Sequence, residues 1–179
     1  MNKKVCSFPI LFALLALLIG TCAVVFPASA QAAPTSTGSI TVSGTVASSY
    51  DAYQIFSANV VDGDSDAKIA TDLAWANDAA RDAALPVLHS AGMPNSQTTA
   101  QEAAEWLNTD SHLTSALSAQ LARSLQSSGA VSVALNAGTT AGLPCGYWLI
   151  VANDDAISQN EAGTAPVMVL VGGSAVTVN

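Results

Sequence analysis

Residues 142–151 read GLPCGYWLIV, and this stretch decides between very different kinds of protein. A proline and a glycine flank Cys145, and an unbroken apolar run follows from Tyr147 to Val151. Proline fixes φ and glycine permits positive φ, so residues 144–146 are expected to form a tight turn. The run behind the turn is apolar on both parities, which is typical of a strand buried on both faces. Cys145 is therefore interpreted as a turn residue beside a sheet.

Two other interpretations of Cys145 remain open. A thiol nucleophile needs a nearby base, and the chain has two histidines, His89 and His112. Neither histidine stands in a recognisable motif with the cysteine, so thiol catalysis is the weaker interpretation. If the N-terminal segment with Cys6 and Cys22 is removed, Cys145 has no partner within its own chain, and a disulfide between chains is the remaining option.

The first thirty residues are predicted to be a secretory signal peptide. Lysines at positions 3 and 4 precede an apolar run over residues 8–26, and the Ala-Ser-Ala of residues 28–30 has the pattern that signal peptidase cleaves. A linker over residues 31–37 is expected to follow the cut. Residues 19–22 loosely resemble a lipobox, but a bulky threonine precedes the cysteine and the apolar run continues beyond it. An exported protein without a membrane anchor after cleavage is therefore expected.

The charge of the chain limits its partners. Thirteen acidic side chains stand against five basic ones, which gives a net charge of −8 at pH 7, and two of the five cations belong to the predicted leader. Nucleic-acid binding needs a basic face, so nucleic acid is excluded as a partner. The residues behind the leader make up about one domain, which is long enough to bury a core without a metal or a disulfide. An acidic exterior fits a secreted or cell-surface protein.

Strand patterns flank a block with helical periodicity. Residues 38–46 alternate apolar and polar side chains, and residues 50–56 form a second, aromatic-rich strand. Apolar residues then recur at three- and four-residue steps, which predicts two or three amphipathic helices between about residues 70 and 128. The strands expected after this block are residues 131–135, 147–151, 166–171 and 176–178.

The helical block carries its own boundary signals. Its first helix is expected over residues 71–90, with Pro86 kinking or ending it. Thr99 and Glu102 have the spacing of a capping box, which predicts the start of a second helix. A third helix is expected to bury four leucines that recur every four residues: Leu113, Leu117, Leu121 and Leu125.

The order of strands, helices and strands predicts the fold class. We expect an α+β chain, a mainly antiparallel, Ig-like β-sandwich over residues 38–179. The block of two or three helices is expected as an insertion between the second and third strands.

One acidic loop is the candidate metal site. Asp62, Asp64 and Asp66 alternate as at the start of a calcium loop, but an EF-hand needs glycine at its sixth position and glutamate at its twelfth. Those positions hold Ala67 and Leu73, so the EF-hand is excluded. A weak calcium site of another kind competes with an ordinary acidic hairpin loop. No catalytic residue and no cofactor-binding residue is predicted.

Three segments resemble the N-terminal domain of sortase-assembled Gram-positive pilins, the major fimbrial subunits. GSITVSGTVASSYDAYQIF, residues 38–56, is similar to the family's opening strand and its Tyr-x-Ala-Tyr-Gln-Ile-Phe motif. GLPCGYWLIVAND, residues 142–154, resembles its Leu-x-Pro-Gly-Tyr-Tyr-Leu-Val turn and strand, and APVMVLVGGSAVTVN, residues 165–179, resembles its closing strands. The resemblance implies a pilin-like fold, with the helical block in the place of the family's variable insertion.

The chain departs from the family at its covalent chemistry. Residues 39–46 hold no lysine, so the Lys–Asn isopeptide bond of the family's usual placement is not expected. The Pro-Lys that the resemblance implies after the last strand is also missing from the printed sequence. Behind the leader the one lysine is Lys68, expected in a loop, and it is the weak candidate for an isopeptide bond or an acceptor amine.

The predicted function follows from these expectations. We expect a non-enzymatic, exported module of the cell surface, structural or adhesive, that works like a pilus (fimbrial) subunit and needs no cofactor. Its partners would be other surface subunits that pair with exposed strand edges, the closing VTV of residues 176–178 being one candidate. The alternative is a secreted single-domain module that binds a host protein or a glycan through the helical block.

Overall fold

The computed structural model describes residues 37–43, 49–62, 67–109, 111–153, 165–173 and 175–178. All of them belong to one compact unit, residues 32–179. The predicted leader lies outside the described residues, as does the predicted linker except for Thr37. In chain order the elements are β1 (Thr37–Val42), β2 (Tyr50–Asp62), β3 (Lys68–Trp75), α1 (Asp78–Ser90), α2 (Ala100–Asn108), α3 (Ser115–Ser127), β4 (Ser132–Leu135), β5 (Gly138–Pro144), β6 (Gly146–Ala152), β7 (Val167–Val171) and β8 (Val176–Val178).

The described strands form two sheets. The smaller sheet has the order β5-β1-β8, with β5 antiparallel and β8 parallel to β1. The larger, here called the central sheet, has the order β3-β2-β6-β7, and β4 pairs with the first half of β2. All pairs in the central sheet are antiparallel. The predicted class, α+β with mostly antiparallel sheets and inserted helices, is confirmed at this level.

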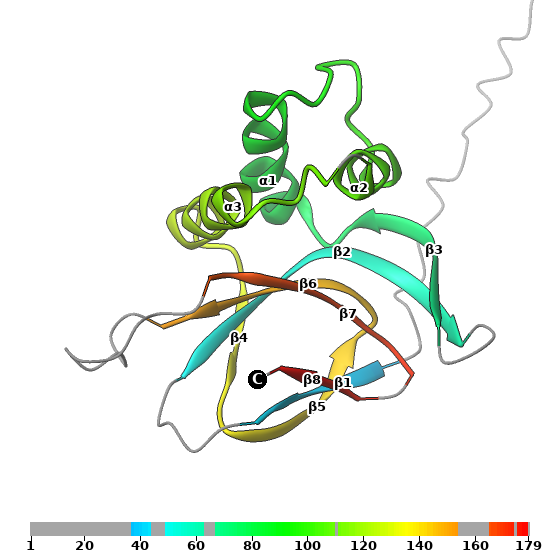
Figure 1. The fold of residues 1–179 in the computed structure, drawn as a ribbon, viewed down its shortest axis with the longest axis vertical. Coiled ribbons are helices and arrows are strands. Elements are labelled where there is room, and N and C mark those ends of the chain that lie inside the picture. The colour runs from blue at the N-terminus through cyan, green and yellow to red at the C-terminus, as the bar shows by residue number, and fades with distance from the viewer. Residues whose placement is uncertain are drawn as a thin grey trace, which may run out of the picture. The chain divides into compact units, whose positions relative to one another are not determined.

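The central sheet is buried on both faces, and β6 shows why. Trp148 and Ile150 point to the cluster shared with the smaller sheet, whereas Leu149 and Val151 point to the cluster under the helices. Figure 1 shows this layering, with the helices gathered on one side of β2 and β6 and the smaller sheet on the other. The prediction that this apolar run is a doubly buried strand is confirmed. Residues 166–171 are also apolar on both parities, but β7 is an end strand of the sheet and its Val167 is 46% exposed.

The helical block starts later than the sequence pattern predicts. Residues 68–75 form β3 rather than helical turns, and α1 begins at Asp78 after an Asn77 cap, whose side-chain oxygen accepts from the Ala80 amide at 2.8 Å. The insertion therefore spans residues 78–127 and follows the third strand, not the second. Apolar steps before Asp78 are too few to separate a helix from a strand, and pairing with β2 decides the conformation.

The other helix signals have mixed outcomes. Thr99 and Glu102 form the predicted capping box, so α2 begins where expected. Pro86 lies inside α1, which continues to Ser90, so of the two effects expected of the proline the end of the helix is wrong and the kink stays a prediction. Three of the four leucines expected on the third helix are buried on α3: Leu117, Leu121 and Leu125.

Leu113 is the exception among those leucines. Thr114 is the N-cap of α3, and its hydroxyl accepts from the Leu117 amide at 3.2 Å. The cap starts the helix after Leu113, which remains 38% exposed in the connection from α2. The cap therefore leaves the large apolar side chain of Leu113 at the surface next to α2.

Candidate functional site

Cys145 lies where the chain passes from β5 in the smaller sheet to β6 in the central sheet. Its side chain is fully buried, with 0% exposure. Its carbonyl oxygen accepts two hydrogen bonds, from Gln54 Nε2 at 3.0 Å and from the Ala58 amide at 3.2 Å. This position agrees with a turn residue beside a sheet. A thiol buried to this degree cannot reach a substrate or another chain without opening the fold.

The residues on either side of Cys145 are fixed just as tightly. Gly146 has φ +140°, and a Cβ there would lie 2.0 Å from the carbonyl oxygen of Phe56. Trp148 donates from its indole nitrogen to the Pro144 carbonyl at 3.0 Å. Only glycine allows β6 to approach β2 this closely. The stretch GLPCGYWLIV is therefore a structural joint between two sheets.

Both histidines support connections within the helical block. His89 Nε2 lies 2.9 Å from the Gln97 carbonyl oxygen. His112 stacks on Trp106 with ring centroids 4.2 Å apart, and its Nδ1 lies 2.7 Å from the Trp106 carbonyl oxygen. Each imidazole is engaged by a backbone carbonyl. Within the described part of the chain, no group of three His, Cys, Asp or Glu side chains is arranged to hold a metal ion.

The candidate calcium loop falls largely outside the described residues. Asp62 ends β2, paired in register with Lys68, while Asp64 and Asp66 lie beyond what the structure describes. The calcium site therefore stays a prediction.

Lys68 does not sit in a loop, as the sequence suggested, but begins β3. Its ammonium group donates to the carbonyl oxygen of Gly172, in the link between β7 and β8. Because β3 already begins at Lys68, its side chain lies beside this link and not in the loop between β2 and β3. Lys68 thus helps to fasten the hairpin to the C-terminal strands.

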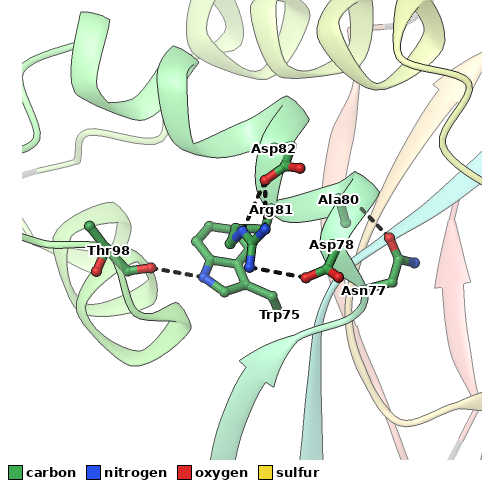
Figure 2. Close-up of polar contacts among 7 residues, drawn as sticks. All are labelled: Trp75, Asn77, Asp78, Ala80, Arg81, Asp82 and Thr98. Carbon is green, nitrogen blue, oxygen red and sulfur yellow. Dashed lines mark hydrogen bonds and ion pairs between the residues drawn. The ribbon is translucent and has the colours of Figure 1, made fainter.

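A polar junction joins β3 to the helices. Figure 2 shows Trp75 donating from its indole nitrogen to the Thr98 carbonyl at 3.0 Å, and Arg81 bridging Asp78 at 3.0 Å and Asp82 at 2.9 Å. The hydrogen bond and charge of Asp82, together with the charge of Asp78, raise the pKa of Arg81 above its ordinary value. Both carboxylates are well exposed, so these pairs stabilise the fold little. The junction lies where β3 ends and α1 begins.

The candidate binding site is a groove between α2 and the helix-facing side of the central sheet. It has a volume of about 280 Å³. Its floor is apolar and comes from four strands, and its polar edge comes from α2, which is the general composition of a ligand site. Its lining residues are Phe56, Ala70, Leu73, Gln101, Ala104, Glu105, Leu107, Asn108, Leu113, Tyr147 and Met168. We call it the α2 groove.

The sequence did not reveal the α2 groove. The helical pattern places Leu73 within the first expected helix, residues 71–90, and Leu113 on the buried face of the third. In the structure one belongs to β3 and the other to the connection before α3, and both line the groove. The only available signal was the position of Thr114 as a possible N-cap, which separates Leu113 from the helix behind it.

No model of a known protein family matches the chain, and no curated protein matches it significantly. Among the helices that the structure describes, none has the length and hydropathy required to cross a membrane.

Proposed function

We propose that this protein is an exported structural or adhesive module of the cell surface, with an Ig-like β-sandwich similar to the N-terminal domain of the pilins that its sequence resembles. The observation that supports this proposal most is the parallel pairing of β1 with β8. Ile40 pairs with Val176 and Val42 with Val178, and the Ser43 amide donates to the Val178 carbonyl at 2.9 Å. The first and last described strands are therefore bonded to each other.

Parallel pairing sets the direction in which the module resists tension. The chain enters β1 at one end of the sheet and leaves β8 at the opposite end. Tension applied through the two ends slides the strands along each other, so the bonds between them are loaded together rather than one after another. β5 adds a second set of bonds along β1, including the contact between the hydroxyls of Thr41 and Thr139 at 2.9 Å. Such a geometry suits a subunit that is pulled along its length at a cell surface.

The edge of the smaller sheet offers a route to assembly. β8 is an end strand in the order β5-β1-β8, as expected for the closing VTV. The outer side of an end strand presents backbone groups that a strand of a neighbouring subunit can pair with. The full burial of Cys145 supports a role without thiol catalysis.

Immunogold electron microscopy of intact cells, with antibody against the described domain, tests the proposal. We expect label on the cell wall or along surface fibres. We also expect an intact mass of the exported protein that begins at Gln31 and shows no loss of ammonia, because no isopeptide bond is expected. Label confined to the cytoplasm would contradict the proposal.

A second candidate function is favoured by the α2 groove. An open site lined by apolar side chains with one polar edge is typical of a binding module. A secreted domain that binds a host protein or a glycan therefore remains the alternative.

A further inference from the structure

We propose that the α2 groove binds one apolar side chain of a partner protein, next to a lysine or arginine of the same partner. The inference goes beyond the structural role proposed above and does not depend on it. It is carried by the size of the groove, the chemistry of its floor and the charge of its edge.

The size of the groove selects a small occupant. Pockets for small molecules and cofactors commonly enclose about 300–1,000 Å³. The α2 groove, at about 280 Å³, lies at the small end of this range. A single large side chain fits this volume, and a whole cofactor would fill it poorly. A partner would therefore insert a single anchor.

The floor of the groove favours an apolar anchor. Phe56 is 1% exposed and is held between Trp75, at 4.9 Å between ring centroids, and Tyr147, at 6.2 Å. Around this rigid floor lie Met168, whose thioether chain adapts to different shapes, and Leu113, which is 38% exposed. Covering these side chains removes apolar surface from water. A sugar would place several hydroxyls against a floor that offers them few partners.

The edge of the groove favours a cation. Gln101, Glu105 and Asn108 follow one another along one side of α2. Gln101 Nε2 donates to Glu105 Oε1 at 2.7 Å, which orients the carboxylate without neutralising its charge. None of the described residues that line the groove is basic.

The net charge of the protein points the same way. At −8, it attracts basic partners more than acidic ones. An anchor followed by a lysine or arginine would satisfy both the floor and the edge.

The first test uses capped tetrapeptides and the purified full chain, followed through the methyl signals of Leu107, Leu113 and Met168 in NMR spectra. We expect Gly-Leu-Lys-Gly to shift these signals in a saturable way. Exchanging the leucine for alanine should weaken binding roughly tenfold, because most of the buried apolar surface is lost. Exchanging the lysine for glutamate should also weaken it.

Two variants with matched controls link binding to the groove. Glu105→Lys should reverse the preference, so that the glutamate peptide binds better than the lysine peptide. Asp82→Lys makes the same change in charge on α1, away from the groove, and should keep the original preference. Ala104→Met should fill the groove and abolish binding, whereas Ala119→Met, an equal enlargement on α3, should leave it intact.

Several outcomes would overturn the inference. They are no saturable shift with any tetrapeptide, an unchanged preference in Glu105→Lys, or full binding by Ala104→Met. NMR shifts produced by monosaccharides and not by peptides would mean that the groove binds a glycan and not a protein. Unfolding curves of each variant, measured first, distinguish a lost site from a lost fold.

Discussion

The two faces of the central sheet differ in how completely they are covered. On the face toward the smaller sheet, Ile40, Leu135, Trp148 and Val171 are at most 3% exposed. On the opposite face, α1 and α3 cover the sheet, but α2 leaves the groove open. One face is a closed core, and the other combines a core with the candidate site.

The three helices differ in how they are held against the sheet. α1 presents Ala83 and Ala84, both buried, and Ser124 of α3 donates to the Ala83 carbonyl at 2.7 Å, so these two helices approach each other and the sheet closely. α2 begins at its capping box, contacts β3 and buries Ala100, Ala103 and Leu107. Another side of the same helix, with Gln101, Glu105 and Asn108, lines the groove. The helical face therefore combines a buried core with the groove beside α2, which is the proposed binding site.

The largest effect is expected at Gly146, in the joint between the two sheets. Gly146→Ala places a Cβ 2.0 Å from the Phe56 carbonyl oxygen at a φ of +140°. The joint between the sheets must then move, and we expect the free energy of unfolding to fall by more than about 3 kcal/mol. Urea unfolding measures the loss.

Gly142→Ala is the matched control for the joint. Gly142 also has positive φ, +77°, but a Cβ at this position would meet no atom within 4 Å. Gly142→Ala should lower the free energy of unfolding only by the cost of holding an alanine at positive φ, about 1–2 kcal/mol. Equal losses at the two glycines would mean that the close approach to Phe56 does not hold the sheets together.

Two leucines from the same four-residue series separate the covered and open parts of the helical face. Leu121→Ala removes a side chain that is 1% exposed, and we expect a loss of about 3 kcal/mol. Leu113→Ala should change the free energy of unfolding by less than about 1 kcal/mol. The same variant should weaken the binding of peptides in the groove. Thermal unfolding and peptide titration of both variants measure the two effects. A larger loss of stability at Leu113 would mean that the groove is part of the core.

Cys145 tests whether the joint is structural or reactive. Cys145→Ser places a hydroxyl at a fully buried apolar position, and we expect a loss of about 1–3 kcal/mol. Cell-surface assembly at a temperature where the variant is folded should be unchanged. Modification of Cys145 by a thiol reagent in the native protein, at the rate of an exposed thiol, would contradict the buried position.

The smallest effect concerns the cap of α2 and depends on pH. Hydrogen bonds from the Thr99 hydroxyl and from the Thr99 and Thr98 amides lower the pKa of Glu102 below its usual 4.5. Its ionised form therefore stabilises the fold above that pH, and this contribution disappears as the pH falls through the lowered pKa.

Glu102→Gln isolates this contribution, because the amide can still accept from the cap without a charge. The variant should be slightly less stable at neutral pH, and the difference from the original chain should shrink in acid. Unfolding curves at several pH values check this. A difference that grows as the pH falls would have the wrong sign for this carboxylate.

The sequence predicted what local patterns encode. Leu149 and Ile150 indicate a doubly buried strand because both parities of β6 are apolar, and Thr99 with Glu102 indicates α2 because a cap is made by neighbours in the chain. Leu73 was misplaced because it fits both a helical step and a strand, and only pairing with distant β2 decides between them. The α2 groove was missed for a related reason, since its walls come from segments far apart in the sequence.

Mechanical unfolding of single molecules tests the proposed role under tension most directly. Handles at Thr37 and after residue 179 load β1 and β8 in shear, whereas handles at Thr37 and Ala175 lie at the same end of the parallel pair and peel it open. In the chain that begins at Gln31, cysteine handles are compatible with Cys145, which is buried. We predict a clearly higher unfolding force in the shear direction. Equal forces in the two directions would contradict the claim that the pairing of β1 with β8 carries tension through this protein.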